Sequence, residues 1–267
     1  MTPLSQKKLF LFDIDGTIAV GDTLFEGSRE LLSYIASIGG KAYYITNNST
    51  KSAADYIQKF HDSFHLETTA DQFITSGYMT IRFLKENYKD QKIFVLGTRS
   101  FVTELKKNHL SVTEKAEEGI SCVVVAYDSE LNYEKLVEVS RVLFTTDVPF
   151  YATNPDLRCP IDFGFIPDCG SFCAAISLST GKQPKYLGKP FAETVEMVLD
   201  KTGFAAPEVA FVGDRLYTDV ATGVKNGAVG LLVLTGETHL EDVPTSEVQP
   251  DAIFASLGEM GQQLCQL

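Results

Sequence analysis

Short apolar runs that end in acidic or other polar residues recur along this chain. The first run, Leu9–Phe12, leads directly into Asp13, Asp15 and Gly16. A continuous apolar run of this length is typical of a buried strand, so the acids would lie at the carboxyl edge of a sheet. Open α/β sheets bind their ligands at that edge. Because side chains alternate along an extended backbone, Asp13 and Asp15 can lie on the same side before the chain turns at Gly16.

The segments that follow alternate between helical and extended patterns. Residues 28–38 carry apolar side chains on one helical face, and two glycines end that pattern. Residues 42–45 then have the composition of a second strand, which runs into Thr46 and Asn47. A strand, a helix and a strand joined by short connections predict a parallel sheet with a right-handed crossover.

The pattern restarts at about residue 92 and continues through the rest of the chain. It predicts strands at 93–96, 120–126, 150–152, 185–187, 209–212, 229–234 and 252–254, and helices that begin near residues 100, 132, 171 and 191. Residues 153–170 differ, because three prolines and two glycines predict a long ordered loop or a hinge there. The fold class is therefore expected to be α/β.

Polar groups of complementary kinds follow four of the predicted strands. In chain order they are Asp13 and Asp15, then Thr46 and Asn47, then Lys189, then Asp214 and Asp219. In one parallel sheet the four strand ends would point to the same edge, so these groups could converge on one cleft. Several carboxylates together imply a hard cation, most simply Mg²⁺. The hydrogen-bond donors and the lysine beside them would suit a bound phosphate.

Composition and charge narrow the class of partner. The chain has 267 residues, of which 44% are apolar and 22% charged, as in an ordinary globular protein. Its formal charge of −12 and its lack of Lys and Arg clusters argue against nucleic acid or an anionic membrane as a partner. Five irregularly spaced cysteines, no leader and no apolar span indicate a cytoplasmic protein. A small anionic substrate stays open, since a few local cations can reverse the field within one cleft.

The order of the motifs resembles the haloacid dehalogenase (HAD) superfamily. Four motifs match in sequence: an Asp-x-Asp-x-Thr loop at 13–17, the threonine at 46, the lysine at 189, and a late Gly-Asp at 213–214 with a second aspartate at 219. Within this superfamily the chain resembles the NagD-like or p-nitrophenylphosphatase-like branch, on segments 46–49, 152–156, 188–190 and 213–219. The resemblance covers nearly the whole chain.

This resemblance implies a Rossmann-like parallel-sheet core with a second α/β domain, the cap, inserted into it. The catalytic core would consist of residues 1–80 and 184–267, and the substrate-selecting cap of residues 81–183. One departure from the family pattern lies in the cap, where Asp168, Cys169 and Gly170 replace a Gly-Ala-Gly-like turn. If Asp168 faces the cleft, it would disfavour a second anionic group on the substrate.

The resemblance also implies three catalytic residues. Asp13 would be the nucleophile that becomes an aspartyl phosphate, and Asp15 would protonate the leaving alcohol and later activate water. Lys189, together with Mg²⁺, would remove the repulsion between the attacking carboxylate and a dianionic phosphate. These three residues form the expected catalytic set.

Further residues would hold the metal and the substrate. Mg²⁺ would be bound by Asp13, Asp214 and the backbone oxygen of Asp15, with Asp219 and Thr17 supporting these ligands. The residues expected to bind the phosphoryl group or the rest of the substrate are Thr46, Asn47, Lys189 and Asn154.

These expectations describe a Mg²⁺-dependent phosphomonoesterase that hydrolyses small phosphorylated metabolites, such as nucleoside monophosphates or sugar phosphates. The alternatives are a phosphomutase of the same superfamily and a non-catalytic protein that binds a phosphorylated ligand. The pair Asp13 and Asp15 argues against binding alone, which needs no second acid. A nicotinamide-binding domain is disfavoured, because no Gly-x-Gly-x-x-Gly follows the first strand. The sequence leaves a homodimer open.

Overall fold

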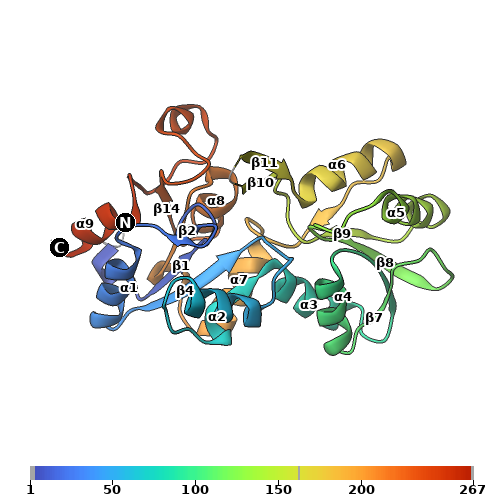
Figure 1. Cartoon of the computed structure of the whole chain (residues 1–267), viewed down its shortest axis with the longest axis horizontal. Helices are drawn as coiled ribbons and strands as arrows, with labels where there is room; N and C mark the ends of the chain where they lie inside the picture. The colour runs from blue at the N-terminus through green and yellow to red at the C-terminus, as the bar shows by residue number, and fades with distance from the viewer. Residues whose placement is uncertain (1–3, 162, 266–267) are drawn as a thin grey trace. The chain divides into compact units, whose positions relative to one another are not determined.

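The computed structural model describes residues 4–161 and 163–265 (Figure 1), so residues 1–3, 162 and 266–267 of the predicted core and cap lie outside the described residues. Contacts within the chain divide it into two compact units. The first unit consists of Met1–Thr46, Tyr56–Ile74 and Lys189–Leu267, and the second of Asn47–Asp55 and Thr75–Gly188.

The first unit is built on a six-stranded sheet with the order β15-β14-β13-β1-β4-β5. Its strands are β1 (Leu9–Phe12), β4 (Lys41–Thr46), β5 (Phe73–Thr75), β13 (Val209–Gly213), β14 (Val229–Val233) and β15 (Ala252–Phe254). The pairs from β15 to β4 are parallel. Every residue of β1, β13 and β14 is buried, as expected for strands that are covered on both faces.

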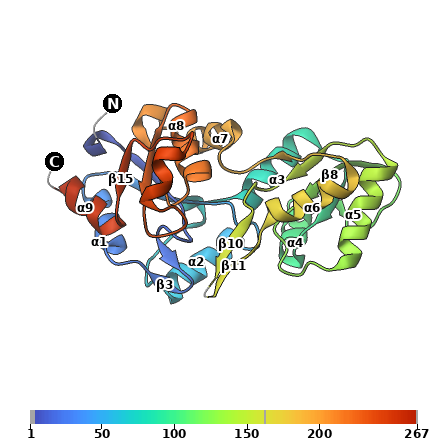
Figure 2. The same ribbon diagram turned by 90° about the horizontal axis from the view of Figure 1, so that it is seen from above.

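Five helices lie wholly or mostly in the first unit. They are α1 (Ser28–Ser37), α2 (Ala53–Asp62), α7 (Ala192–Thr202), α8 (Ala221–Lys225) and α9 (Leu257–Cys265). Helix α1 packs against α9, and α7 packs against α8 (Figure 2). Smaller elements are the hairpin β2 (Ala19–Val20) and β3 (Thr23–Leu24), the π-helical turn Leu216–Val220, and 3-10 turns at Leu4–Gln6, Ala70–Gln72, Ala206–Glu208 and Leu240–Thr245.

The position of β1 in this sheet determines where a ligand can bind. From β1 the chain proceeds to β4 and β5 on one side, and β13, β14 and β15 later fill the other side. The strand order therefore reverses between β1 and β13. Open α/β sheets bind ligands at the carboxyl ends of the strands at such a reversal. The register pairs Phe12 with Val212, so the residues after these two strands leave the sheet side by side.

The second unit contains a five-stranded parallel sheet with the order β12-β9-β8-β6-β7. Its strands are β6 (Lys92–Leu96), β7 (Ser111–Thr113), β8 (Ile120–Val125), β9 (Phe150–Ala152) and β12 (Lys185–Tyr186). Its helices are α3 (Ser76–Asn87), α4 (Arg99–Lys107), α5 (Tyr133–Thr145) and α6 (Cys169–Thr180). An antiparallel hairpin is formed by β10 (Arg158–Ile161) and β11 (Gly164–Pro167).

Each helix of the second unit starts at a side chain that accepts a hydrogen bond from a backbone N–H of its first turn. These capping residues are Thr75, Thr98, Asn132 and Asp168. A cap satisfies an N–H group that has no partner within the helix and contributes about 1 kcal/mol. Across residues 4–161 and 163–265, every helix is too short or too polar to span a bilayer.

The predicted fold class, α/β with a Rossmann-like parallel sheet and a second α/β part, is confirmed by the two parallel sheets. The prediction of a loop or hinge at 153–170 is wrong in part, because this segment contains the hairpin β10–β11. Proline and glycine suggested a loop there. A two-stranded hairpin has only edge strands, however, and edge strands tolerate proline.

A second difference concerns the strand that precedes Lys189. Its place before Lys189 led us to expect it in the core sheet, but β12 pairs with β9 and belongs to the second sheet. The chain enters the first unit only at Lys189. An apolar pattern identifies a strand but not the sheet to which it belongs.

Candidate active site

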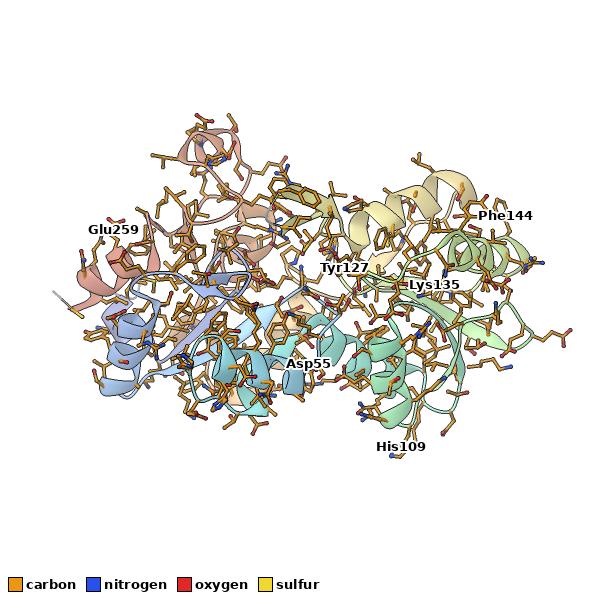
Figure 3. All side chains as sticks on the ribbon, viewed as in Figure 1. Asp55, His109, Tyr127, Lys135, Phe144 and Glu259 are labelled. Carbon is orange, nitrogen blue, oxygen red and sulfur yellow. The ribbon has the colours of Figure 1, made fainter. Side chains whose placement is uncertain are left out.

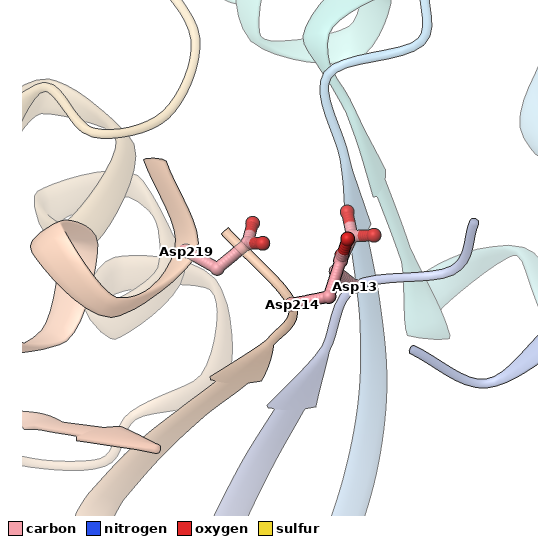
Figure 4. A group of neighbouring side chains, drawn as sticks. All are labelled: Asp13, Asp214 and Asp219. Atoms are coloured by element: carbon pink, nitrogen blue, oxygen red, sulfur yellow. The ribbon is translucent and has the colours of Figure 1, made fainter. Parts of the chain in front are cut away.

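Three carboxylates meet at the edge of the first sheet where the strand order reverses. Asp13 follows β1, Asp214 follows β13, and Asp219 lies in the π-helical turn after β13. One carboxylate oxygen from each residue lies within 4.8 Å of the other two. Figure 4 shows Asp13 and Asp214 at the ends of neighbouring strands, with the carboxylate of Asp219 directed toward them. We call these three residues the acidic cluster.

A buried lysine compensates part of this negative charge. Lys189 Nζ lies 2.6 Å from Asp13 Oδ1 and 2.6 Å from Asp219 Oδ1. It also donates a hydrogen bond to the backbone oxygen of Ile45, at the end of β4. Its side chain is only 2% exposed, so Lys189 is not a solvated loop residue. Lys189 reaches the acidic cluster although the strand that precedes it, β12, belongs to the other sheet.

The charge balance of this group fits a divalent cation. When ionised, the three carboxylates of the acidic cluster and the one ammonium of Lys189 leave an excess of two negative charges in a buried place. Buried charge of one sign is strongly unfavourable unless a counter-charge neutralises it. Carboxylate oxygens are the ligands that Mg²⁺ prefers. Asp13, Asp214 and Asp219 therefore have the donor chemistry and the spacing to hold this ion.

The acid–base properties of the site reflect the same crowding. Burial raises the pKa of Asp13 well above its usual range. The ammonium of Lys189 lowers this pKa, whereas the nearby Asp219 and Asp214 carboxylates raise it further. Burial and the Asp219 carboxylate likewise raise the pKa of Asp214 to about 6. Burial alone would lower the pKa of Lys189, but Asp13 and Asp219 together raise it. Burial and crowding thus favour the protonated forms of Asp13 and Asp214 relative to free carboxyl groups.

Glycines allow the chain to pass close to the carboxylates. A Cβ atom on Gly236 would lie 2.1 Å from Asp214 Oδ2, and one on Gly16 would lie 2.7 Å from the same oxygen. Gly16 also has a φ of +96°, which L side chains rarely adopt. A Cβ on Gly213 would lie 2.2 Å from Asp219 Cβ. Larger residues at these positions would displace the acidic cluster.

A loop after β14, residues 235–238, holds Asp214 in place. The backbone N–H of Glu237 donates to Asp214 Oδ2 at 2.7 Å, and Thr235 Oγ1 donates to the backbone oxygen of Gly16 at 2.7 Å. Glu237 Oε2 lies 2.9 Å from Arg215 Nε, and both side chains are 11% exposed. Sequence reasoning missed this loop. A glycine in a polar stretch directly after a buried strand is the only local feature that indicates it.

The other predicted residues of the first unit lie as follows. Thr17 is buried, and its Oγ1 donates to Asp214 Oδ1 at 3.3 Å. Asp15 is outside the acidic cluster, since its side chain is 33% exposed and its Oδ1 lies 3.8 Å from Lys59 Nζ. Thr46 is buried at the end of β4. Their assigned roles stay predictions, including the Asp15 backbone oxygen as a metal ligand.

Two predicted substrate-binding residues belong to the second unit. Asn47 is buried, and its backbone oxygen accepts a hydrogen bond from Ser76 Oγ at 2.6 Å. Asn154 is fully buried, and its amide donates to Asp168 Oδ1 at 3.1 Å. Asp168 also caps α6 through the N–H of Cys169. Asp168 therefore has a structural role, and the expectation that it repels an anionic substrate loses its basis. The substrate-binding roles of Asn47 and Asn154 stay predictions.

Comparison with known proteins shows which family this chain resembles. Residues 10–111 match the family described as haloacid dehalogenase-like hydrolase, and residues 186–260 match one described as HAD-hydrolase-like. The chain is 31% identical over 248 residues to an acid sugar phosphatase of Staphylococcus epidermidis. This match covers 93% of this chain and 94% of that protein.

Solved structures agree with this result. A 4-nitrophenylphosphatase from Thermotoga maritima is 36% identical with a TM-score of 0.90, over 97% of this chain and 98% of that one. NagD from E. coli K-12 is 28% identical with a TM-score of 0.84, and the match covers 95% of this chain and 98% of NagD. The chain therefore belongs to the haloacid dehalogenase-like hydrolases, as the motifs predicted. It is a phosphatase of the group that contains NagD and the p-nitrophenyl phosphatases.

The first prediction concerns the pH dependence of stability without metal. The pKa of Asp214 rises from 3.8 to about 6 on folding, so the folded state binds more protons than the unfolded state between these values. The free energy of unfolding must then fall as pH rises through this window. We expect the free energy of unfolding of Asp214→Asn, measured by thermal melting in EDTA from about pH 4 to about pH 7, to decrease less with pH than that of the wild type. Identical pH slopes for the variant and the wild type would contradict the assignment.

The second prediction concerns the close approach of Gly236 to Asp214. Gly236→Ala places a Cβ where the Asp214 carboxylate now lies, and displacing a reacting group by about 1 Å can reduce the rate ~10²-fold. We expect kcat/KM for p-nitrophenyl phosphate to fall at least ~10²-fold, with little change in Tm. Gly261→Ala in α9 is the control, because its Cβ would meet only ordinary contacts beginning at 3.6 Å. Equal activity of both variants would show that the 235–238 loop does not position Asp214.

Proposed function

We propose that this phosphatase hydrolyses small phosphate monoesters with Mg²⁺ through an aspartyl phosphate on Asp13. The observation that carries the proposal is the buried contact of Lys189 with both Asp13 and Asp219, beside Asp214. A structural ion pair needs one acid for each base. The excess of carboxylates around one lysine instead suits a site that recruits a cation and an anionic substrate.

Asp13 would attack phosphorus in the first step. Its Oδ1 is already held by Lys189, so the attacking carboxylate is oriented and its charge is partly neutralised. Bound Mg²⁺ would supply the remaining positive charge against the phosphoryl oxygens. The bond from phosphorus to the ester oxygen breaks as the bond to Asp13 forms, and the leaving alcohol needs a proton.

Asp15 is the proposed donor of that proton. Its carboxylate is partly exposed and lies apart from the acidic cluster, so it can exchange protons with water and with a leaving group. In the second step the same carboxylate would take a proton from the water that attacks the aspartyl phosphate. Thr46 and Asn47 would bind the transferring phosphoryl group, as the family resemblance implies.

We further propose a division of labour between the two parts of the chain. The groups proposed for the chemistry, Asp13, Asp15, Lys189 and Asp214, all belong to the first unit. The second unit would select the substrate, with Asn154 as the predicted contact. This assigns the catalytic function to the predicted core and the selective function to the predicted cap.

The curated relatives suggest which esters to test first. The S. epidermidis relative carries the name acid sugar phosphatase, which favours sugar phosphates over nucleoside monophosphates as substrates of this chain. A panel of both classes, assayed for free phosphate with Mg²⁺ and with EDTA, tests this directly. Release of phosphate in step with substrate loss supports a phosphatase. Transfer of the phosphoryl group without release would support a phosphomutase.

The nucleophile is tested by Asp13→Asn. The amide has nearly the same shape as the carboxylate but cannot attack phosphorus, so we expect turnover to fall by several orders of magnitude. Circular dichroism and Tm should show an intact fold. A variant with one-tenth of the wild-type rate would rule out the aspartyl-phosphate mechanism.

The role of Lys189 is tested by Lys189→Met. Removing one electrostatic stabiliser should reduce kcat by about 10²-fold to 10³-fold. Lys8→Met is the control, since Lys8 pairs with Glu208 at an exposed position and should retain full activity. Unchanged kinetics for Lys189→Met in a folded protein would exclude a catalytic role for this ammonium.

A further inference from the structure

Helix α2 carries a nearly buried lysine, Lys59, whose side chain is only 10% exposed. Lysine is rarely buried to this extent unless its charge has a partner. The Lys59 ammonium has two partners. Its Nζ lies 3.8 Å from Asp15 Oδ1 and 5.4 Å from the centre of the Phe64 ring, whose face attracts a cation. Lys59 therefore lies beside the residue that is proposed to donate the proton to the leaving alcohol.

Helix α2 gives Lys59 a well-defined position. At the start of the helix, the N–H of Ser52 donates to Asp55 Oδ2, and the N–H of Asp55 donates to Ser52 Oγ. This reciprocal pair of hydrogen bonds stabilises the first turn, in which Asp55 is labelled in Figure 3. Farther along, the buried rings of Phe60 and Phe64 pack together with their centres 5.1 Å apart. The helix that carries Lys59 is thus anchored on both sides of this residue.

The carboxylate of Asp15 is less constrained than the backbone that carries it. The backbone is held by a turn, in which the N–H of Gly16 donates to the oxygen of Ala19 at 2.8 Å. The Asp15 side chain is 33% exposed, and across residues 4–161 and 163–265 the side chain that pairs with it is that of Lys59. A partly exposed carboxylate without a partner can occupy several rotamers. The orientation of the Asp15 carboxylate therefore depends on Lys59.

We infer that Lys59 is a positioning residue for proton transfer by Asp15, an inference that rests on the role proposed for Asp15. A lysine ammonium only donates, so the oxygen that faces it, Oδ1, acts as an acceptor and the proton is carried by Oδ2. As the bond from phosphorus to the ester oxygen breaks, its electron pair stays on the ester oxygen, which takes the proton from Oδ2. Lys59 keeps its own protons throughout this step.

A comparison of two leaving groups tests this inference. An alkyl alcohol leaves poorly unless it receives a proton, whereas p-nitrophenolate leaves as a stable anion. Loss of a residue that positions the acid should therefore slow alkyl esters selectively, which a merely structural defect would not do. The parameter to measure is kcat/KM, because it covers the reaction up to the departure of the alcohol. The two substrates are p-nitrophenyl phosphate and the alkyl monoester that the wild type hydrolyses fastest.

Lys59→Met and Lys59→Gln remove the charge but keep an unbranched side chain. We expect each to lower kcat/KM for the alkyl monoester by about tenfold to 10²-fold, and for p-nitrophenyl phosphate by less than about threefold. Lys59→Arg keeps a cation and should recover most of the loss. Lys41→Met is the matched control, since Lys41 Nζ lies 5.5 Å from the centre of the Phe204 ring and should affect neither ester. Retained Tm and p-nitrophenyl phosphate turnover would show that the variants fold.

Asp15→Asn separates a failure of this inference from a failure of the proposed function. If Asp15 is the proton donor, this variant should lose more kcat/KM for the alkyl monoester than for p-nitrophenyl phosphate. Given that result, the role of Lys59 alone is overturned if Lys59→Met and Lys59→Gln show no loss, or a loss no larger for the alkyl monoester than for p-nitrophenyl phosphate. An Asp15→Asn variant that slows both esters equally would overturn the proton donor itself, and the role of Lys59 with it.

Discussion

The contact of one buried ammonium with two buried carboxylates is the constraint on which the first unit depends. Lys189 Nζ lies 2.6 Å from both Asp13 and Asp219, although these residues are far apart in the sequence. Leaving any of these charges buried without its partner is strongly unfavourable, so the chain must bring all three to one point. The parallel sheet achieves this, because the carboxyl ends of β1 and β13 leave it side by side. Glycines at 16, 213 and 236 then let neighbouring backbone approach the carboxylates.

The same constraint links stability to function. Burial, together with the neighbouring carboxylates, raises the pKa of Asp13 and of Asp214, because concentrated negative charge in a buried place is unfavourable. A divalent cation removes this penalty and adds the positive charge that an anionic substrate needs. The tight loop of residues 235–238 holds Asp214 in position through the backbone N–H of Glu237. The acidic cluster and its single lysine therefore form an electrostatic imbalance that the proposed cation would relieve.

Much of this arrangement could be predicted from the sequence. Apolar runs that end in acids identify β1 and β13. Because ligands bind at the carboxyl ends of parallel strands, the sequence alone predicts that Asp13 and Asp214 lie together. The α/β fold class followed from alternating patterns. These features are local, or they follow from topology that is nearly invariant in α/β proteins.

The remaining features depend on contacts between segments that are distant in sequence. Nothing local reveals that β12 joins the second sheet while Lys189, three residues after that strand, belongs to the first unit. The role of Glu237 depends on the fold of the loop after β14 against Asp214. In the sequence Asp168 resembles a substrate contact, whereas in the structure it is buried as the cap of α6. Charged and capping residues look alike in sequence, and only their burial and partners separate them.

The claim that the acidic cluster holds a divalent cation is tested most directly by isothermal titration of the metal-free protein with Mg²⁺. We expect the wild type to bind a single Mg²⁺ and Asp214→Asn, with its fold intact, to lose this binding. Asp147→Asn, which changes an exposed acid of the second unit, should bind as the wild type does. A wild type that binds no Mg²⁺, or an Asp214→Asn variant that binds it as tightly as the wild type, would show that the acidic cluster does not hold this cation.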